Sequence, residues 1–210
     1  MTSTTIKPSK GGQDNRVDRV LEAALAEFGR RGFAGAREGV IAREAGIAAA
    51  TLKRLFPSKE ELFREVVRST IVTTLETSQL TAFRPVPESG VARLREFIQW
   101  FWRTMEEPSQ AALLRLSVGE LQRFPELAVF HATEVVGRAA HKLERILVES
   151  VHEGEFRVAD PRVTARVILA ALITHAQWFA RPDLYGGLTG VDRAGAESSV
   201  VNAVLESLRS

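Results

Sequence analysis

Residues 37–63, REGVIAREAGIAAATLKRLFPSKEELF, contain the signals that decide the fold. A short apolar stripe ends at Ala45, and Gly46 follows where a helix would end in a left-handed cap. A second short helix ends at Phe56-Pro57, because the residue before a proline is pushed out of the helical region. Two helices joined by a short turn that contains glycine form a helix-turn-helix, whose second helix enters a DNA major groove. The stretch therefore predicts a DNA-binding unit.

A capping pattern starts the helix that follows this unit. Ser58 and Glu61 are spaced as a capping box, in which the serine oxygen accepts a hydrogen bond from the amide three residues on. The helix is expected to run to about Gln79, ahead of a linker at residues 83–87.

Upstream, apolar residues from Val17 to Phe28 fall on one helical face and predict a first helix. Residues 1–13 show no periodicity and are expected to form a disordered tail, which is either a frayed terminus or a basic arm that reaches DNA phosphates. We therefore divide the chain into the tail 1–13, a helix-turn-helix domain 14–60 and a helical domain 61–210.

The apolar spacing stays helical through the rest of the chain. Amphipathic helices are predicted over residues 91–105, 113–124, 126–153, 161–180 and 192–208. The segment 181–190 contains a proline and three glycines and is expected to form a break between the last two helices. No alternating strand pattern appears, so the predicted fold class is all-α, an N-terminal helix-turn-helix domain followed by a C-terminal helical domain.

Composition excludes several classes of site. The 210 residues include no cysteine, which rules out disulfides, thiol catalysis and cysteine-ligated zinc. The four histidines lack metal-ligand spacing, and we expect neither a metal nor a cofactor. No apolar run is long enough to span a bilayer, which favours a cytoplasmic protein with no membrane partner. Residues 1–64 hold 12 Lys and Arg against 8 Asp and Glu, whereas the remainder holds 16 against 18, a balance compatible with an N-terminal nucleic-acid surface.

Three segments, AALAEFGRRGF (23–33), IAREAGI (41–47) and TLKRLFPSKEELF (51–63), resemble the N-terminal domain of TetR/AcrR-family transcriptional regulators. The resemblance implies a homodimer that binds a palindromic double-stranded DNA operator and represses a nearby promoter. It also implies that a small-molecule effector enters the C-terminal domain, moves the two recognition helices apart and releases the DNA. Such an effector acts only through its difference in affinity between the two states.

On this resemblance, six residues are candidates for DNA contact, by base edge or by phosphate: Arg37, Ala49, Ala50, Thr51, Lys53 and Lys59. Lys59 matches a common phosphate contact at the start of a helix, and Lys53 stands where the family usually has tyrosine. Each charged residue in the set could also be an ordinary solvated side chain.

The recognition segment departs from the family pattern. Ala36 and Ala48 replace the usual Ser or Thr before each helix of the pair, and each lost N-cap should cost about 1 kcal/mol. Glu38 and Gly39 replace a core aliphatic and a polar helix former. Three consecutive alanines, 48–50, cannot make bidentate hydrogen bonds to bases, although they can contact thymine methyl groups. We therefore expect weaker or less selective DNA binding than in a typical member.

The helical domain contains two further sets of candidates. Bulky residues that could line an apolar, possibly aromatic, effector site, or belong to the core, are Trp100, Phe101, Met105, Leu116, Phe130, His131, Val135, His175 and Trp178. Residues expected at a four-helix dimer interface, or in ordinary packing within one chain, are Val163, Val167, Ala170, Ala171, Thr174, Val201, Val204, Leu205 and Leu208.

Two rival interpretations remain open at this stage. An enzyme is disfavoured, because no nucleophile elbow, phosphate-binding glycine loop or carboxylate dyad is present. The other rival is a TetR-like dimeric ligand- or protein-binding module with weak or lost sequence-specific DNA binding, which the alanine-rich recognition helix favours.

Overall fold

The computed structural model describes residues 10–72, 89–189 and 193–209, and within these ranges it contains helices and no strand. The N-terminal elements are α1 (Lys10–Gly35), α2 (Glu38–Glu44), α3 (Ala49–Leu55), α4 (Lys59–Val67) and its π-helical continuation η1 (Arg68–Val72). The C-terminal elements are α6 (Gly90–Glu106), α7 (Pro108–Gly119), η3 (Leu121–Arg123), α8 (Pro125–His131), η4 (Ala132–Gly137), α9 (Arg138–His152), α10 (Pro161–Ala180), α11 (Pro182–Thr189) and α12 (Arg193–Arg209). The prediction of an all-α fold is confirmed.

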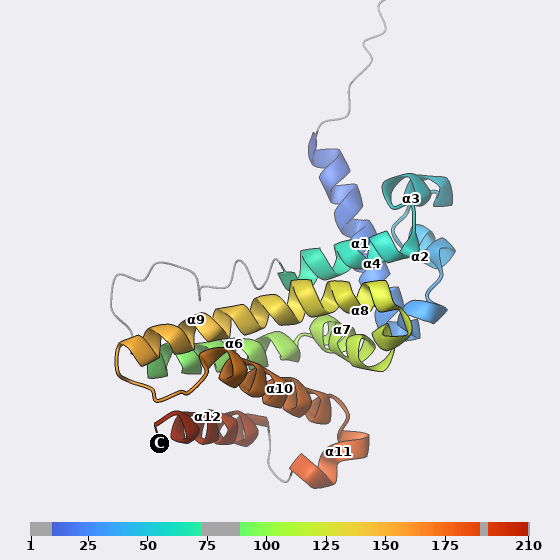
Figure 1. The fold of residues 1–210 in the computed structure, drawn as a ribbon. Helices are drawn as coiled ribbons and strands as arrows, with labels where there is room; N and C mark the ends of the chain where they lie inside the picture. Colours follow the sequence, from blue (N-terminus) through green and yellow to red (C-terminus); the bar gives the residue numbers. More distant parts are fainter. Residues whose placement is uncertain (1–9, 73–88, 190–192, 210) are drawn as a thin grey trace, which may run out of the picture.

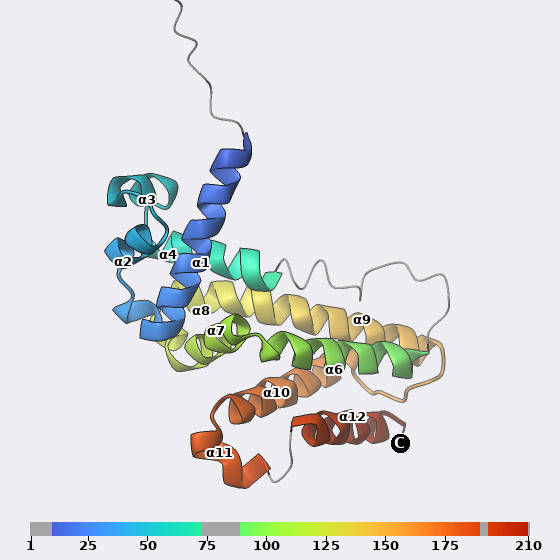
Figure 2. The same cartoon turned by 180° about the vertical axis from the view of Figure 1, so that it is seen from behind.

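The helices form a long body with the helix-turn-helix at one end. The α8, η4 and α9 helices follow one another as a single rod, and α6 lies beside α9 (Figure 1). The α10 and α12 helices cover the side of α6 and α9 that faces away from α4 (Figure 2). The start of α1 and the α3 helix project from the same side of the body, away from α10 and α12, whereas α4 lies along the rod.

Element boundaries agree with the apolar spacing over most of the chain. The rod spans 125–152 against a predicted 126–153, and α10 spans 161–180 as predicted. The α1 helix starts at Lys10, so the expected tail 1–13 is wrong for its last four residues. The expected continuation of α4 beyond Val72 and the linker at 83–87 lie outside the described residues.

One predicted break is a helix. The segment after α10 was expected to be irregular, but α11 occupies Pro182–Thr189. Proline is tolerated at this first helical position, because the amide hydrogen it lacks would have no partner inside the helix. Arg181 further orders the start of the helix by donating from its guanidinium to Asp183 at 2.7 and 2.9 Å.

The helix-turn-helix unit shares its core with the helical domain. Phe28, Phe33 and Phe63 are buried in one cluster with Leu113 and Leu121, which lie beyond the expected domain boundary. That boundary, between residues 60 and 61, also divides α4. A unit of about 50 residues buries too little apolar surface to be stable alone, and α7, η3 and α8 supply the remainder. A second cluster joins α6, α9, α10 and α12.

A single carboxylate joins the two parts at the end of α1. Gly32 interrupts α1 with φ 70° and ψ 175°, a conformation that is essentially restricted to glycine. The exposed amides of Phe33 and Ala34 then donate to the Glu120 carboxylate at 2.8 and 3.3 Å. A Cβ atom on residue 32 would lie 1.8 Å from a Glu120 oxygen, so only glycine allows this approach.

Substitution of Gly32 by alanine tests this junction. We expect Gly32→Ala to lower the free energy of unfolding by about 1–3 kcal/mol, because it combines backbone strain with loss of the Glu120 hydrogen bonds. Gly39→Ala is the matched control, since no atom lies within 4 Å of its added methyl group and residue 39 is inside α2. That substitution should raise stability by about 0.5–1 kcal/mol. Urea denaturation of both variants measures the difference, and equal effects would contradict the assignment.

Candidate nucleic-acid interface

The α2 and α3 helices meet in the predicted helix-turn-helix geometry. Gly46 has φ 68°, and the amide of Ile47 donates to the Ala42 carbonyl at 3.0 Å to close the end of α2. Ile41 and Leu52, both buried, hold the two helices against α1. At the next boundary the Ser58 oxygen accepts from the Glu61 amide at 3.1 Å, as the capping pattern predicts. The frame of the unit is therefore confirmed.

The start of α2 is stabilised by a residue from another helix. The N-cap is Arg37 rather than Ala36, so the predicted position of the missing cap is wrong. The carboxylate of Glu27, which is 1% exposed, accepts from the Arg37 amide at 3.3 Å. This bond performs the function of the missing serine or threonine oxygen. The start of α3 does lack a side-chain cap at Ala48, as predicted.

Glu27 also pairs with two arginines at the end of α1. Arg30 and Arg31 each approach its carboxylate at 3.3 Å, and Arg30 continues to Glu44 of α2 at 2.9 Å. Buried carboxylates need such partners, because an isolated charge in the interior is costly. Through these ion pairs Arg30 links α1 to α2, and both arginines compensate the buried carboxylate.

Lys59 has an internal role that the sequence did not reveal. Its ammonium group donates to the carbonyls of Ala34 and Ala36 at 3.2 and 3.3 Å and lies 4.9 Å from the centre of the Phe33 ring. Two of its three donors are thus used within the chain, and one remains for a phosphate. The phosphate contact of Lys59 stays a prediction, whereas its hydrogen bonds to the two carbonyls are present in the structure.

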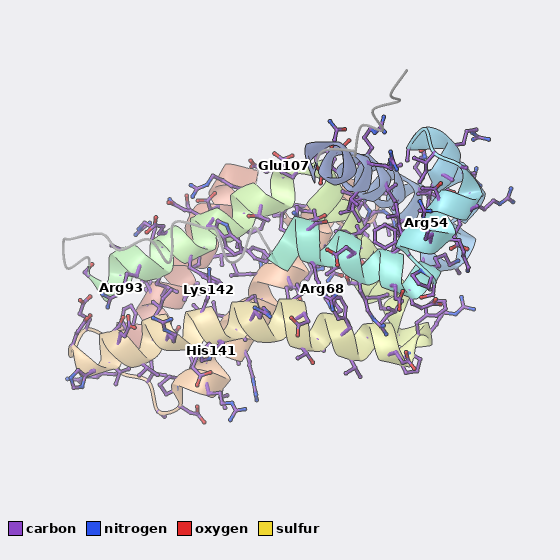
Figure 3. The ribbon with its side chains drawn as sticks, turned by 90° about the horizontal axis from the view of Figure 1, so that it is seen from above. Arg54, Arg68, Arg93, Glu107, His141 and Lys142 are labelled. Atoms are coloured by element: carbon purple, nitrogen blue, oxygen red, sulfur yellow. The ribbon has the colours of Figure 1, made fainter. Side chains whose placement is uncertain are left out.

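The remaining candidates for DNA contact are at least partly accessible to solvent. Arg37, Ala49, Ala50 and Lys53 are exposed and Thr51 is half-buried. Sequence reasoning missed two further exposed cations, Arg43 on α2 and Arg54 on α3. Arg54 lies at the helix-turn-helix end of the molecule, remote from Arg93 and Lys142 (Figure 3). Arg54 directly follows Lys53 in the sequence, and this adjacency could have identified it as a further candidate.

The predicted effector residues are divided among three places. Leu116, Phe130 and Val135 belong to the cluster around the helix-turn-helix. Trp100, Phe101 and Met105 belong to the second cluster. His175 and Trp178 pack together near the start of α11, where the Trp178 and Tyr185 rings are 6.4 Å apart. The nine residues therefore do not form one cluster.

The two histidines in that set have different environments. Burial of His131 lowers its pKa to about 4, so the imidazole is neutral near pH 7. The His175 ring nitrogen lies 2.9 Å from the Ala171 carbonyl one turn earlier in α10, which is an ordinary contact within a helix. Arg68, the first residue of η1, faces the α8 rod, with its guanidinium carbon 5.2 Å from the centre of the Phe130 ring (Figure 3).

The residues predicted at a dimer interface separate by helix. On α10, Val163, Val167, Ala170 and Thr174 are exposed and Ala171 is half-buried. On α12, Val201, Leu205 and Leu208 are at most 5% exposed and pack inside the chain, and Val204 is half-buried against the same cluster. The α12 part of the prediction is therefore wrong for the three buried residues. The amphipathic pattern identified the apolar face of α12 but not what covers it.

The described residues contain neither a metal-binding cluster nor a membrane-spanning helix. Over residues 10–72, 89–189 and 193–209, acidic and histidine side chains form no group of three that could hold a metal ion. Among the helices of these ranges, none is both long and apolar enough to cross a membrane.

Two family models match the chain. Residues 20–66 match the model described as bacterial regulatory proteins, tetR family. Residues 92–208 match the model described as AefR-like transcriptional repressor, C-terminal domain. The first covers the helix-turn-helix and α4, and the second covers α6 through most of α12.

Individual proteins give the same picture. The HTH-type transcriptional regulator RutR of Escherichia coli K12 is 26% identical over 193 residues, which cover 90% of this chain and 89% of RutR. The fatty acid degradation regulator FadR from Bacillus halodurans superposes with a TM-score of 0.75 at 20% identity, covering 91% of this chain and 99% of that one. FadR from Bacillus subtilis, solved with stearoyl-CoA, superposes with a TM-score of 0.74 at 18% identity over the same shares. The two superpositions show a common fold.

Replacement of Lys59 separates its structural role from DNA contact. We expect Lys59→Met to lower the free energy of unfolding by about 1–2 kcal/mol, because two charged hydrogen bonds and the contact with Phe33 are lost. Lys53→Met removes an exposed cation and should change stability by less than about 0.5 kcal/mol. Thermal unfolding of both variants without DNA is the measurement. An unchanged midpoint for Lys59→Met would assign Lys59 to DNA alone.

Proposed function

Because the chain belongs to the TetR family of helix-turn-helix transcriptional regulators, we propose that it is a ligand-responsive repressor that binds a palindromic operator as a homodimer. The observation that carries the proposal is the helix-turn-helix at 38–55, with Ala49, Ala50 and Lys53 of α3 accessible to a major groove. The family model over the C-terminal domain carries the word repressor in its description.

The exposed face of α10 supports a dimer. Val163 and Val167 are 51% and 63% exposed, and they lie on one face of α10 with Ala170 and Thr174. A valine that is more than half exposed on a long helix is available for an isologous contact with a second copy. Two-fold symmetry would then hold two α3 helices at a fixed spacing along the DNA, which is what recognition of a palindrome requires.

A buried amide supports a site for a small-molecule effector. Gln110 is 5% exposed, and its nitrogen donates to the Thr70 carbonyl at 3.0 Å. Within the described part of the chain, its oxygen is buried without a hydrogen-bond partner. An orphaned acceptor is costly, and a ligand hydroxyl or amide would satisfy it.

The α7 helix connects this amide to the DNA-binding unit. Gln110 lies in the first turn of α7, and Glu120, which binds the amides of Phe33 and Ala34, directly follows its last turn. A ligand bound at Gln110 would shift the operator-binding equilibrium only if it favours one position of α7 over the other. DNA would be released if, in the position of α7 that the ligand favours, Glu120 lies farther from the end of α1.

The proposal is tested by selection of bound fragments from the genome that encodes the chain. We expect one palindromic sequence to be enriched next to a promoter, and gel-shift titration should show that a candidate effector weakens binding to it. A dimer that enriches no sequence would favour the rival function, a ligand- or protein-binding module that has lost specific DNA recognition. The alanine-rich start of α3 is the observation in favour of that rival.

The dimer is tested by a charge on the α10 face. Val167→Glu should raise the dimer dissociation constant about tenfold or more, because two-fold symmetry brings a like charge to the same apolar contact. Val129→Glu changes a valine of α8 that is 66% exposed on another face, and it should leave the dimer unchanged. Sedimentation equilibrium over a concentration series compares the two variants. Identical dissociation constants would exclude α10 from the interface.

A further inference from the structure

A shallow hollow lies between the two helices of the helix-turn-helix. It has a volume of about 310 Å³ and is lined by Glu38 of α2 and by Ala49, Ala50, Leu52 and Lys53 of α3. The exposed part of its floor is made by the two alanine methyl groups, since Leu52 is 2% exposed. The Glu38 carboxylate and the Lys53 ammonium supply its charged groups. A small apolar floor flanked by one acceptor and one donor is thus open to solvent.

Glu38 differs from the other acidic residue of α2. Glu44 is paired with Arg30 at 2.9 Å. Glu38 is half-buried, and among residues that the structure describes its side chain makes no hydrogen bond or ion pair. It stands at a position where the resemblance leads us to expect a core aliphatic residue. Its carboxylate acceptors are therefore available at the surface that faces DNA.

The chemistry of the hollow matches pyrimidine bases in the major groove. Thymine presents a C5-methyl group there, which small apolar side chains such as alanine contact. Cytosine presents its N4 amino group, which a glutamate accepts, and the guanine paired with it presents acceptors to a lysine. The alanine methyl groups, the Glu38 carboxylate and the Lys53 ammonium thus match a thymine, an adjacent cytosine and the guanine paired with that cytosine.

We propose that this hollow is a base-reading site for a thymine–cytosine step, in which Glu38 of α2 specifies the cytosine and the alanine floor contacts the thymine methyl. The proposal rests on the proposed function, because it assumes that α3 enters a major groove. It places the specificity-determining carboxylate on the first helix of the pair instead of on the alanine-rich second helix.

The charge of Glu38 adds discrimination. A carboxylate in the groove is repelled by phosphates and by the acceptor edges of guanine and of thymine O4, so it weakens binding wherever no amino group faces it. Affinity for unrelated DNA falls as a result, while the ratio of specific to non-specific binding rises. The site is therefore weak in total affinity but selective.

The test is selection from random-sequence DNA by the full-length wild type and by three variants. Wild type should enrich sites that contain a thymine–cytosine step in each half-site. Glu38→Ala should lose about tenfold in preference at the cytosine position. Glu38→Gln should move the preference at that position from cytosine to adenine, since an amide pairs with the N6 and N7 atoms of adenine. Glu22→Ala, which removes the same charge from an exposed position of α1 outside the hollow, should keep the cytosine preference.

A chemical substitution in the selected operator tests the alanine floor. Replacement of the thymine by uracil removes only the methyl group and should weaken wild-type binding about threefold or more. Circular dichroism establishes whether each variant is folded. If Glu38→Ala does not fold, Glu38→Gln, which is nearly isosteric with the wild type, tests the base preference alone.

The outcomes distinguish this inference from the proposed function. If Glu38→Ala and Glu38→Gln bind all sequences more tightly by one common factor with unchanged base preference, Glu38 only repels phosphate and the inference is overturned, while an enriched operator still supports a repressor. If wild type enriches no sequence, both the regulator and its base-reading site are excluded. A shift from cytosine to adenine in Glu38→Gln is a result that a structural role cannot produce.

Discussion

The orientation of the DNA-binding unit depends on the bond between the Glu120 carboxylate and the amides that follow Gly32. The backbone from Gly32 to Arg37 departs from a regular helix, since Gly32 has non-helical φ and ψ and residues 36–37 lie between α1 and α2. Three side chains outside this segment hold it: Glu120 on the Phe33 amide, Lys59 on the carbonyls of Ala34 and Ala36, and Glu27 on the Arg37 amide. The path of this segment sets where α2 begins and hence the direction of α3.

The shared core connects this junction to both the helix-turn-helix and the C-terminal domain. Phe33 contacts Phe63 of α4 and Phe124 of the C-terminal domain, with ring centres 5.4 and 4.7 Å apart. Packed aromatic clusters resist gradual deformation and shift between discrete arrangements. Under the proposed ligand response, a displacement of α7 would therefore move the end of α1 and α4 together. The helix-turn-helix is expected to respond as one unit and not by internal rearrangement.

Local sequence signals predicted the helices and their turns, whereas contacts between residues far apart in the sequence could not be predicted. Gly46 and Ser58 act within a few residues of their partners, so their roles could be inferred from spacing alone. The Glu120–Phe33 bond joins residues 87 positions apart, and no pattern in the chain links them. The inward face of α12 illustrates a second reason. Periodicity shows that Val201 and Leu205 share an apolar face, but whether the same chain or a second copy covers it depends on tertiary packing.

The lack of polar side chains at the start of α3 and the open hollow beside Glu38 have one physical origin. Alanines at 49 and 50 offer no hydrogen-bonding groups, which is why the sequence suggested weak reading of bases. Their small volume leaves open the hollow in which we propose that Glu38, the first residue of α2, meets a base. In that proposal, a carboxylate from α2 replaces the polar side chains that α3 lacks. Its physical basis is that residues of both helices line one hollow, which the sequence of α3 alone does not reveal.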